Sequence, residues 1–151
     1  SGPVVVFSGG QQFTDIALVE DYLDAIHTRV PSMALATTAQ NKGADVIAAA
    51  WASRKNVPVI LCKPDASRGP SAPYQRNARM LAFKPVEAVV CSGGGIQANL
   101  ADRLREARVP VHIVRNANAQ NEAAPAQAKV ASQGSQQAAK RVANGDDLPP
   151  F

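Results

Sequence analysis

Short apolar runs alternate with longer amphipathic segments along residues 1–115. Five of the runs have the length of a strand, and four of the five are rich in Val or Ile. Unbroken hydrophobicity within a run is typical of strands that are covered on both faces. The runs are Val4–Phe7, Met33–Ala36, Val57–Cys62, Ala88–Cys91 and Val111–Val114. They predict five parallel strands in the interior of the protein.

Apolar residues between these runs recur at the spacing of a helix. In the first segment they stand at Ile16, Val19, Leu23, Ile26 and Val30, every three or four residues along the chain, as on one helix face. Shorter stripes predict three further helices. Their apolar positions include Trp51, Met80 and Leu104. The alternation of strand and helix predicts an α/β fold, a Rossmann-like three-layer sandwich with helices on both faces of a parallel sheet.

Residues 116–151 differ sharply in composition. Ten of these 36 residues are Ala, five are Gln and four are Asn, and such a composition cannot build a core of its own. We therefore expect two parts: a domain of residues 1–115 and a low-complexity C-terminal extension of residues 116–151. The extension is either disordered alone or docked on another subunit. In the second case a homo-oligomer or a protein partner contacts residues 116–151.

The whole chain has 151 residues, enough to bury a sizeable core without disulfides or metals. Its two cysteines, Cys62 and Cys91, form neither a disulfide framework nor a zinc-binding spacing. No apolar run approaches the roughly 18 residues of a membrane span, and the first residues do not resemble a secretory signal. We expect a cytoplasmic protein without membrane contact and without a metal site.

Positive charge gathers in the middle of the sequence. Residues 54–84 contain seven Lys or Arg and one acidic residue, Asp65. Such an excess favours an anionic partner, and a solvated basic face is the alternative. Nucleic acid is one candidate partner, but the seven aromatic residues are spread along the chain, and a base-stacking platform is poorly supported.

Polar, glycine-rich loops follow the predicted strands. In a parallel sheet, ligands bind beyond the carboxyl ends of the strands, where these loops meet. The candidate ligand-binding residues are Gly9, Gly10, Lys42, Gly43, Asp45, Arg76, Asn77, Ser92, Gly93, Gly94 and Gly95. We predict no catalytic residue among them.

These residue types suit a ligand that carries phosphate and ribose. Glycines at 93–95 let backbone amides approach a phosphate at a helix N-terminus. Arg76, which we expect at the start of the third helix with Asn77, could grip the phosphate, and Asp45 could accept ribose hydroxyls. The structural alternatives are a tight strand-to-helix turn at 93–95, a capping role for Asp45 in the first turn of the second helix, an ion pair of Arg76 with Asp45 or Asp65, and helix capping by Asn77.

The four loops together resemble the YspA-like branch of the SLOG superfamily. This Rossmann-like group includes the Lonely Guy phosphoribohydrolases and the DprA DNA-processing proteins. The resemblance covers about residues 4–115 and rests on the order and spacing of four motifs. They are Val4–Gly10 with Phe13-Thr14-Asp15, Lys42–Asp45, Arg76–Met80 and Gly93–Gly95. It implies a nucleotide-derived ligand, such as a nucleotide or ADP-ribose.

Several positions depart from the pattern of that family. The Ser-Arg-Asp of the first loop is replaced by Gly10–Gln12, and two glycines of the second loop by Ala39 and Gln40. In the fourth loop, Ile96-Gln97 replaces Gly-Thr. Leu100 stands where the Lonely Guy enzymes carry a catalytic Glu, and Leu cannot transfer protons. The scaffold is kept while several ligand groups are changed.

Three functions compete on this evidence, beside a DprA-like role on DNA that only the positive charge supports. The first is a non-catalytic domain that binds or senses a nucleotide derivative, and it is the one we expect. The alternative is a structural or assembly protein that has co-opted the fold and uses residues 116–151 for its contacts. An N-ribosyl hydrolase that uses Asp45 or Asp15 comes third, because the catalytic Glu is missing. No cofactor is fixed by the residues.

Overall fold

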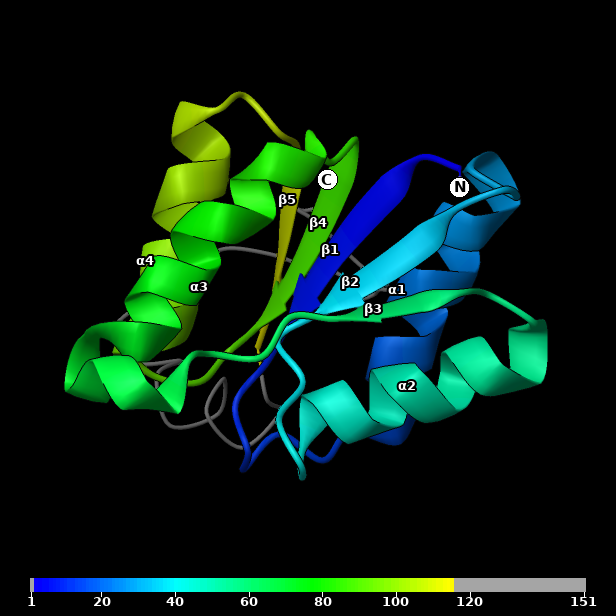
Figure 1. Cartoon of the computed structure of the whole chain (residues 1–151). Helices are drawn as coiled ribbons and strands as arrows, with labels where there is room; N and C mark the ends of the chain where they lie inside the picture. Colours follow the sequence, from blue (N-terminus) through cyan, green and yellow to red (C-terminus); the bar gives the residue numbers. More distant parts are fainter. Residues whose placement is uncertain (1, 116–151) are drawn as a thin grey trace, which may run out of the picture. The chain divides into compact units, whose positions relative to one another are not determined.

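The computed structural model describes residues 2–115 (Figure 1). Five strands alternate with four α-helices and two short 3-10 helices. In chain order they are β1 (Val4–Ser8), α1 (Ile16–Arg29), β2 (Ala34–Thr37), α2 (Ala44–Lys55), β3 (Val59–Leu61), η1 (Ala66–Ser71), α3 (Ala72–Met80), η2 (Leu81–Phe83), β4 (Glu87–Cys91), α4 (Gly95–Glu106) and β5 (Val111–Val114). The predictions about residues 116–151 lie outside the described residues.

The five strands form one parallel sheet in the order β3-β2-β1-β4-β5. The chain first builds outward from β1 through β2 to β3, and then returns to the other side of β1 with β4. The strand order therefore reverses between β1 and β4, which is the switch point where open α/β sheets bind ligands. The predicted α/β, Rossmann-like fold is confirmed.

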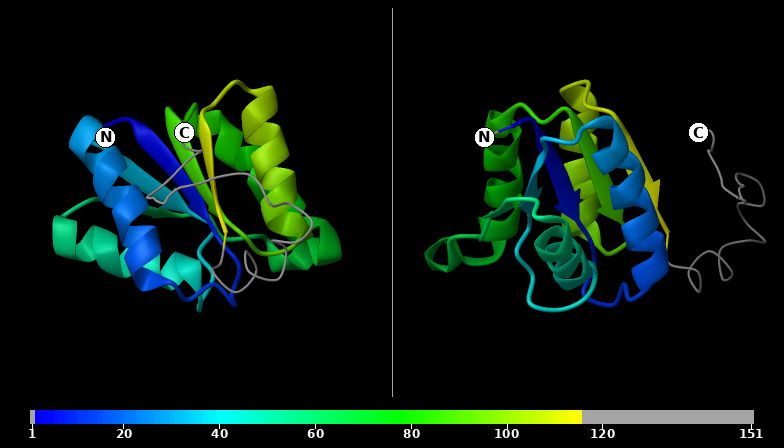
Figure 2. Two further views of the ribbon diagram at one scale, coloured as in Figure 1. Left: turned by 180° about the vertical axis from the view of Figure 1, so that it is seen from behind. Right: turned by 90° about the vertical axis from the view of Figure 1, so that its right-hand side faces the viewer.

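Helices cover both faces of the sheet (Figure 2). Helices α1 and α2 pack Leu23, Ile26 and Trp51 against one face. On the other face, α3 and α4 contribute Met80 and Leu104 to a second apolar cluster. Burial on both faces explains why the strands read as unbroken apolar runs.

The third helix differs from its predicted position. The apolar stripe around Met80 marks only the end of α3, which begins at Ala72, with Pro73 in its first turn. Proline is tolerated there because the first amides of a helix have no partner within it. Arg76 consequently lies in the middle of α3 and not at its start.

None of the helices described between residues 2 and 115 is long and apolar enough to cross a membrane. The cytoplasmic location expected from the sequence stays a prediction.

Candidate functional site

The loops after β1 and β4 pack backbone against backbone at the switch point. A Cβ atom added to Gly10 would lie 2.7 Å from the Cα of Gly93 and 2.9 Å from the carbonyl oxygen of Ser92. Gly43, in the loop after β2, has a φ of 80° and faces the carbonyl of Gly10. These glycines allow the loops to touch, and little space for a ligand remains between them.

Asp45 holds these loops together from the first turn of α2. Its side chain accepts hydrogen bonds from the amides of Gly9 (3.1 Å) and Gln40 (3.0 Å) and from the hydroxyl of Thr38. The residue is 2% exposed. Burial raises the pKa of Asp45, although the three hydrogen bonds and the charge of Arg76 act in the opposite direction. Both carboxylate oxygens are engaged within the protein.

Arg76 is 3% exposed and lies beneath the ends of β2 and β3. Its Nη1 donates to the carbonyls of Thr38 (3.0 Å) and Cys62 (3.1 Å), and its Nε donates to Asn77 Oδ1 (3.1 Å). These bonds take the place of the ion pair with Asp45 or Asp65 that was the structural alternative for Arg76. Burial lowers the pKa of Arg76, and the charge of Asp45 opposes that change.

Asn77 is fully buried and links α3 to α4. Its Nδ2 donates to the carbonyl of Ile96 (2.9 Å) and to Asn99 Oδ1 (3.2 Å). It does not cap the helix, because it lies near the middle of α3. Arg76 and Asn77 together therefore fasten α3 to the strand ends and to the start of α4.

Two glutamines occupy the space around the β1 loop, and sequence reasoning did not nominate them. Gln40 Nε2 donates to the carbonyl of Gly9 (2.5 Å). Gln97 Oε1 accepts from the amide of Gly94 (2.9 Å), while its Nε2 lies 3.4 Å from Ser8 Oγ and from the carbonyl of Gly9. Gln40 and Gln97 stand at positions where the chain departs from the family pattern. That departure is the sequence signal that could have identified them as site residues. The protein's own side chains thus satisfy polar groups at the switch point.

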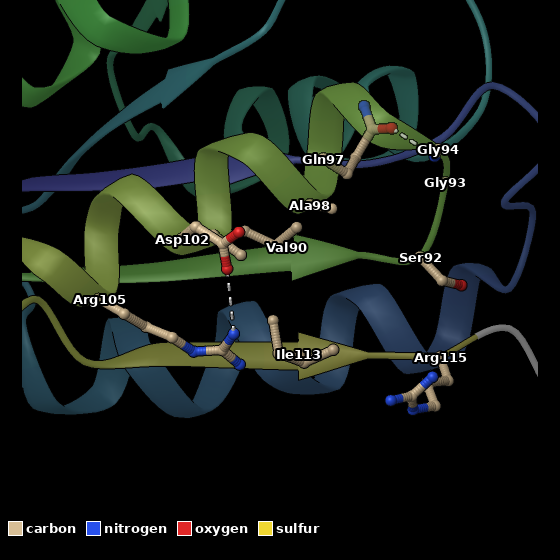
Figure 3. Close-up of a pocket in the computed structure, with 11 residues that line it drawn as sticks. Val90, Ser92, Gly93, Gly94, Gln97, Ala98, Asp102, Arg105, Ile113 and Arg115 are labelled. Atoms are coloured by element: carbon tan, nitrogen blue, oxygen red, sulfur yellow. Dashed lines mark hydrogen bonds and ion pairs between the residues drawn. The ribbon is translucent and has the colours of Figure 1, made fainter.

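A pocket of about 490 Å³ lies on the other side of α4, between that helix and β5 (Figure 3). Part of its wall is apolar and includes Val90, Ala98 and Ile113, and the Gln97 side chain also lines it. At one end, the near end, it is bounded by Ser92–Gly94 and by Arg115. Asp102 and Arg105 lie at the far end, with Arg105 Nη1 3.9 Å from Asp102 Oδ1.

The pocket brings together only part of the predicted site. Ser92, Gly93 and Gly94 line it. Lys42 is exposed on the loop after β2 and does not belong to the lining. The remaining nominated residues also lie outside the pocket lining. They are Gly9, Gly10, Gly43, Asp45, Arg76, Asn77 and Gly95.

The start of α4 has the electrostatics of an anion site. A Cβ atom added to Gly94 would meet nothing within 4 Å, although the amide of Gly94 already donates to Gln97 Oε1. The amides of Gly95 and Ile96 belong to the first turn, where the helix supplies no carbonyl partner. The helix dipole places partial positive charge at this end, and Arg115 adds a full charge nearby.

The basic stretch of residues 54–84 is partly neutralised in the fold. Arg54 pairs with Glu20 and Lys55 with Asp24, both across the α1–α2 interface. Arg68 pairs with Asp65 within η1 and its N-cap. Arg76 is buried, so fewer free positive charges remain there than the sequence indicated.

The carboxylates nominated for hydrolysis have structural roles. Asp45 is engaged as described, and Asp15 caps α1 by accepting from the amide of Leu18 (3.1 Å). Leu100 is fully buried in the apolar cluster beneath α4. Between residues 2 and 115, no group of three or more His, Cys, Asp or Glu side chains could hold a metal ion.

Residues 3–69 match the sequence model of the YspA, cpYpsA-related SLOG family. The resemblance to the YspA-like branch of SLOG is thereby confirmed over this part of the chain. The match includes the first two loop motifs, whereas Arg76–Met80 and Gly93–Gly95 lie beyond it. No curated protein matches the chain significantly.

Proposed function

We propose, on the premise of the SLOG family match over residues 3–69, that this domain binds a phosphate-bearing nucleotide derivative without transforming it. A mononucleotide or an ADP-ribose-like molecule is the ligand class. The observation that carries the proposal is the pocket between α4 and β5, which combines a partly apolar wall with a near end formed by the backbone of Ser92–Gly94 and the Arg115 side chain.

The phosphate lies at the near end in this proposal. It lies beside the backbone of Ser92–Gly94 at the start of α4, where the helix dipole favours an anion, and the Arg115 guanidinium balances its charge. The pocket lining contains two Arg side chains, Arg105 and Arg115, against one carboxylate, Asp102. This excess of positive charge favours an anion over a neutral nucleoside.

A binding role agrees better with these side chains than hydrolysis does. Cleavage of an N-ribosyl bond needs a positioned acid–base group. Asp45 and Asp15 already accept hydrogen bonds from the protein, and Leu100 is buried among apolar side chains.

The test is calorimetry of the full chain with 5′-nucleoside monophosphates, ADP-ribose and the corresponding unphosphorylated nucleosides. We expect at least one phosphorylated ligand to bind, with affinity that falls as salt is raised. The nucleosides should bind at least about tenfold more weakly, because they lack the charge-assisted hydrogen bonds of the phosphate.

Gly94→Asp is the sharpest variant for this test. Asp is a favourable N-cap residue, so the substitution should keep or raise the melting temperature. Its carboxylate would compete for the first-turn amides and repel an incoming anion, and binding should be lost.

Arg115→Ala should weaken binding, whereas Arg54→Ala removes an equal charge at the α1–α2 interface and should have no effect. Phosphate-dependent binding that is unchanged in Gly94→Asp would contradict the site. Absence of binding by every ligand at millimolar concentration would contradict the function.

A further inference from the structure

The two ends of the α4–β5 pocket differ in chemistry. The near end offers the positive charge of Arg115 beside the start of α4, whereas the far end offers both an acceptor and a donor, Asp102 and Arg105. These two side chains are 74% and 56% exposed and only 3.9 Å apart. Their groups are therefore accessible to a ligand and already lie side by side (Figure 3).

The distance between the ends limits the ligand to one nucleotide unit. Gly94 and Asp102 are eight residues apart along α4, which corresponds to about 12 Å of helix rise. One phosphate, one ribose and one base fill such a span. The wall between the ends is formed by Val90, Ala98 and Ile113, which suits the flat, apolar face of a base.

The far end matches one base better than the others. A carboxylate accepts two hydrogen bonds side by side, and guanine presents two adjacent donors, N1–H and the 2-amino group. A guanidinium donates in a fork, and guanine O6 and N7 are its favoured acceptors among the bases. Adenine places a ring acceptor beside its single amino group, and that acceptor would face the Asp102 carboxylate unfavourably.

We infer that the pocket selects guanine, with Asp102 accepting from N1–H and the 2-amino group and Arg105 donating to O6 or N7. The ligand is then a guanosine 5′-monophosphate or a close derivative of it. The inference rests on the proposed function, because a phosphate held at the near end directs the base toward Asp102.

The test compares GMP, IMP and AMP by calorimetry on the full chain. IMP keeps O6, N7 and N1–H but lacks the 2-amino group, so it isolates one hydrogen bond to a charged acceptor. We expect GMP to bind about tenfold tighter than IMP, and AMP to bind more weakly than GMP.

Asp102→Asn should weaken both ligands, because N1–H loses a charged acceptor in each, and should weaken GMP more, so that the preference for GMP over IMP is largely lost. The substitution should leave the fold intact, because the Asp102 side chain is exposed and its ion pair with Arg105 is long. Glu106→Gln is the matched control, since Glu106 is an exposed acid of the same helix outside the pocket lining. It should leave all three affinities unchanged.

The outcomes separate this inference from the proposed function. Equal binding of the three nucleotides, or a preference for GMP that survives Asp102→Asn, overturns the guanine assignment and leaves phosphate binding intact. Failure of all three nucleotides and of every other phosphorylated ligand overturns both.

Discussion

Gly10 and Gly94 lie at the same edge of the sheet, but their surroundings differ. A Cβ atom at Gly10 would collide with the backbone of Gly93 and Ser92, whereas one at Gly94 would reach open space. Of these two glycines, the first serves packing and the second leaves the start of α4 accessible. A glycine-rich loop in the sequence cannot distinguish these roles, because both produce the same residue type.

Alanine substitution separates the two roles by stability. Gly10→Ala should lower the free energy of unfolding by about 1–3 kcal/mol, because the backbone must move to relieve the overlap. Gly94→Ala should lower it by less than about 1 kcal/mol, since only the preference for Gly over Ala at an N-cap is lost. Urea denaturation followed by circular dichroism measures both. Equal losses in the two variants would contradict this assignment.

Ala39 is a second residue whose backbone conformation, and not its side chain, bears on the stability of the loop. Its φ of 60° is left-handed, and it stands where the resembled family carries glycine. The loop has kept a glycine conformation after losing the glycine. Gln40, which replaces the other glycine, has gained a structural role by donating to the carbonyl of Gly9.

Ala39→Gly should therefore stabilise the protein. Relief of the left-handed strain is worth about 1–2 kcal/mol, and the greater freedom of Gly in the unfolded chain offsets about 0.4–1 kcal/mol of it. The net gain should lie between about 0 and 1.6 kcal/mol. Ala25→Gly, at an exposed position in α1, is the control and should lose about 1 kcal/mol. A similar loss in both variants would refute the argument.

At the scale of elements, the opposite edge of the sheet is held by an ionic cluster. Glu87, the first residue of β4, accepts two hydrogen bonds of 2.8 Å from Arg29 at the end of α1. His112 of β5 contacts the same carboxylate. Burial alone would raise the pKa of Glu87, but the hydrogen bonds and charges of His112 and Arg29 outweigh it and lower the pKa to about 2.

This cluster predicts a specific loss of stability in acid. A carboxylate whose pKa is lower in the folded state stabilises the fold above its unfolded pKa of 4.5. That contribution, about 3 kcal/mol, is lost as the pH falls from about 4.5 through 2. Unfolding free energies of the native protein and Glu87→Gln, measured from pH 6 to pH 2, should converge at the acid end. A constant difference across this range would contradict the prediction.

Elements differed in how well the sequence predicted them. The strands were predictable because Val and Ile runs such as Val4–Phe7 are buried on both faces. The start of α3 was not, since Ala72 is the only buried residue among its first four. The hydrogen bonds of Arg76 could not be predicted from the sequence either. Its acceptors at Thr38 and Cys62 are distant in sequence, and only the sheet topology brings their carbonyls beside α3.

At the scale of the whole molecule, the described part of the chain contains a complete sandwich. Both apolar clusters are drawn from residues between Val4 and Val114. Among the residues that the structure describes, the lining of the α4–β5 pocket runs to Arg115. We predict that these residues suffice for the core and for the candidate site.

A chain that ends after residue 120 should therefore unfold cooperatively, with a free energy within about 0.5 kcal/mol of the full chain. Ending there, and not at residue 115, keeps the new carboxylate away from the Arg115 anion site. Its GMP affinity should be unchanged. The native mass of both chains, measured in parallel, tests the assembly alternative. In that alternative the extension holds subunits together, and its removal lowers the number of subunits in the particle. Loss of cooperative unfolding or of nucleotide affinity in the shortened chain would show that the extension completes the domain or its site.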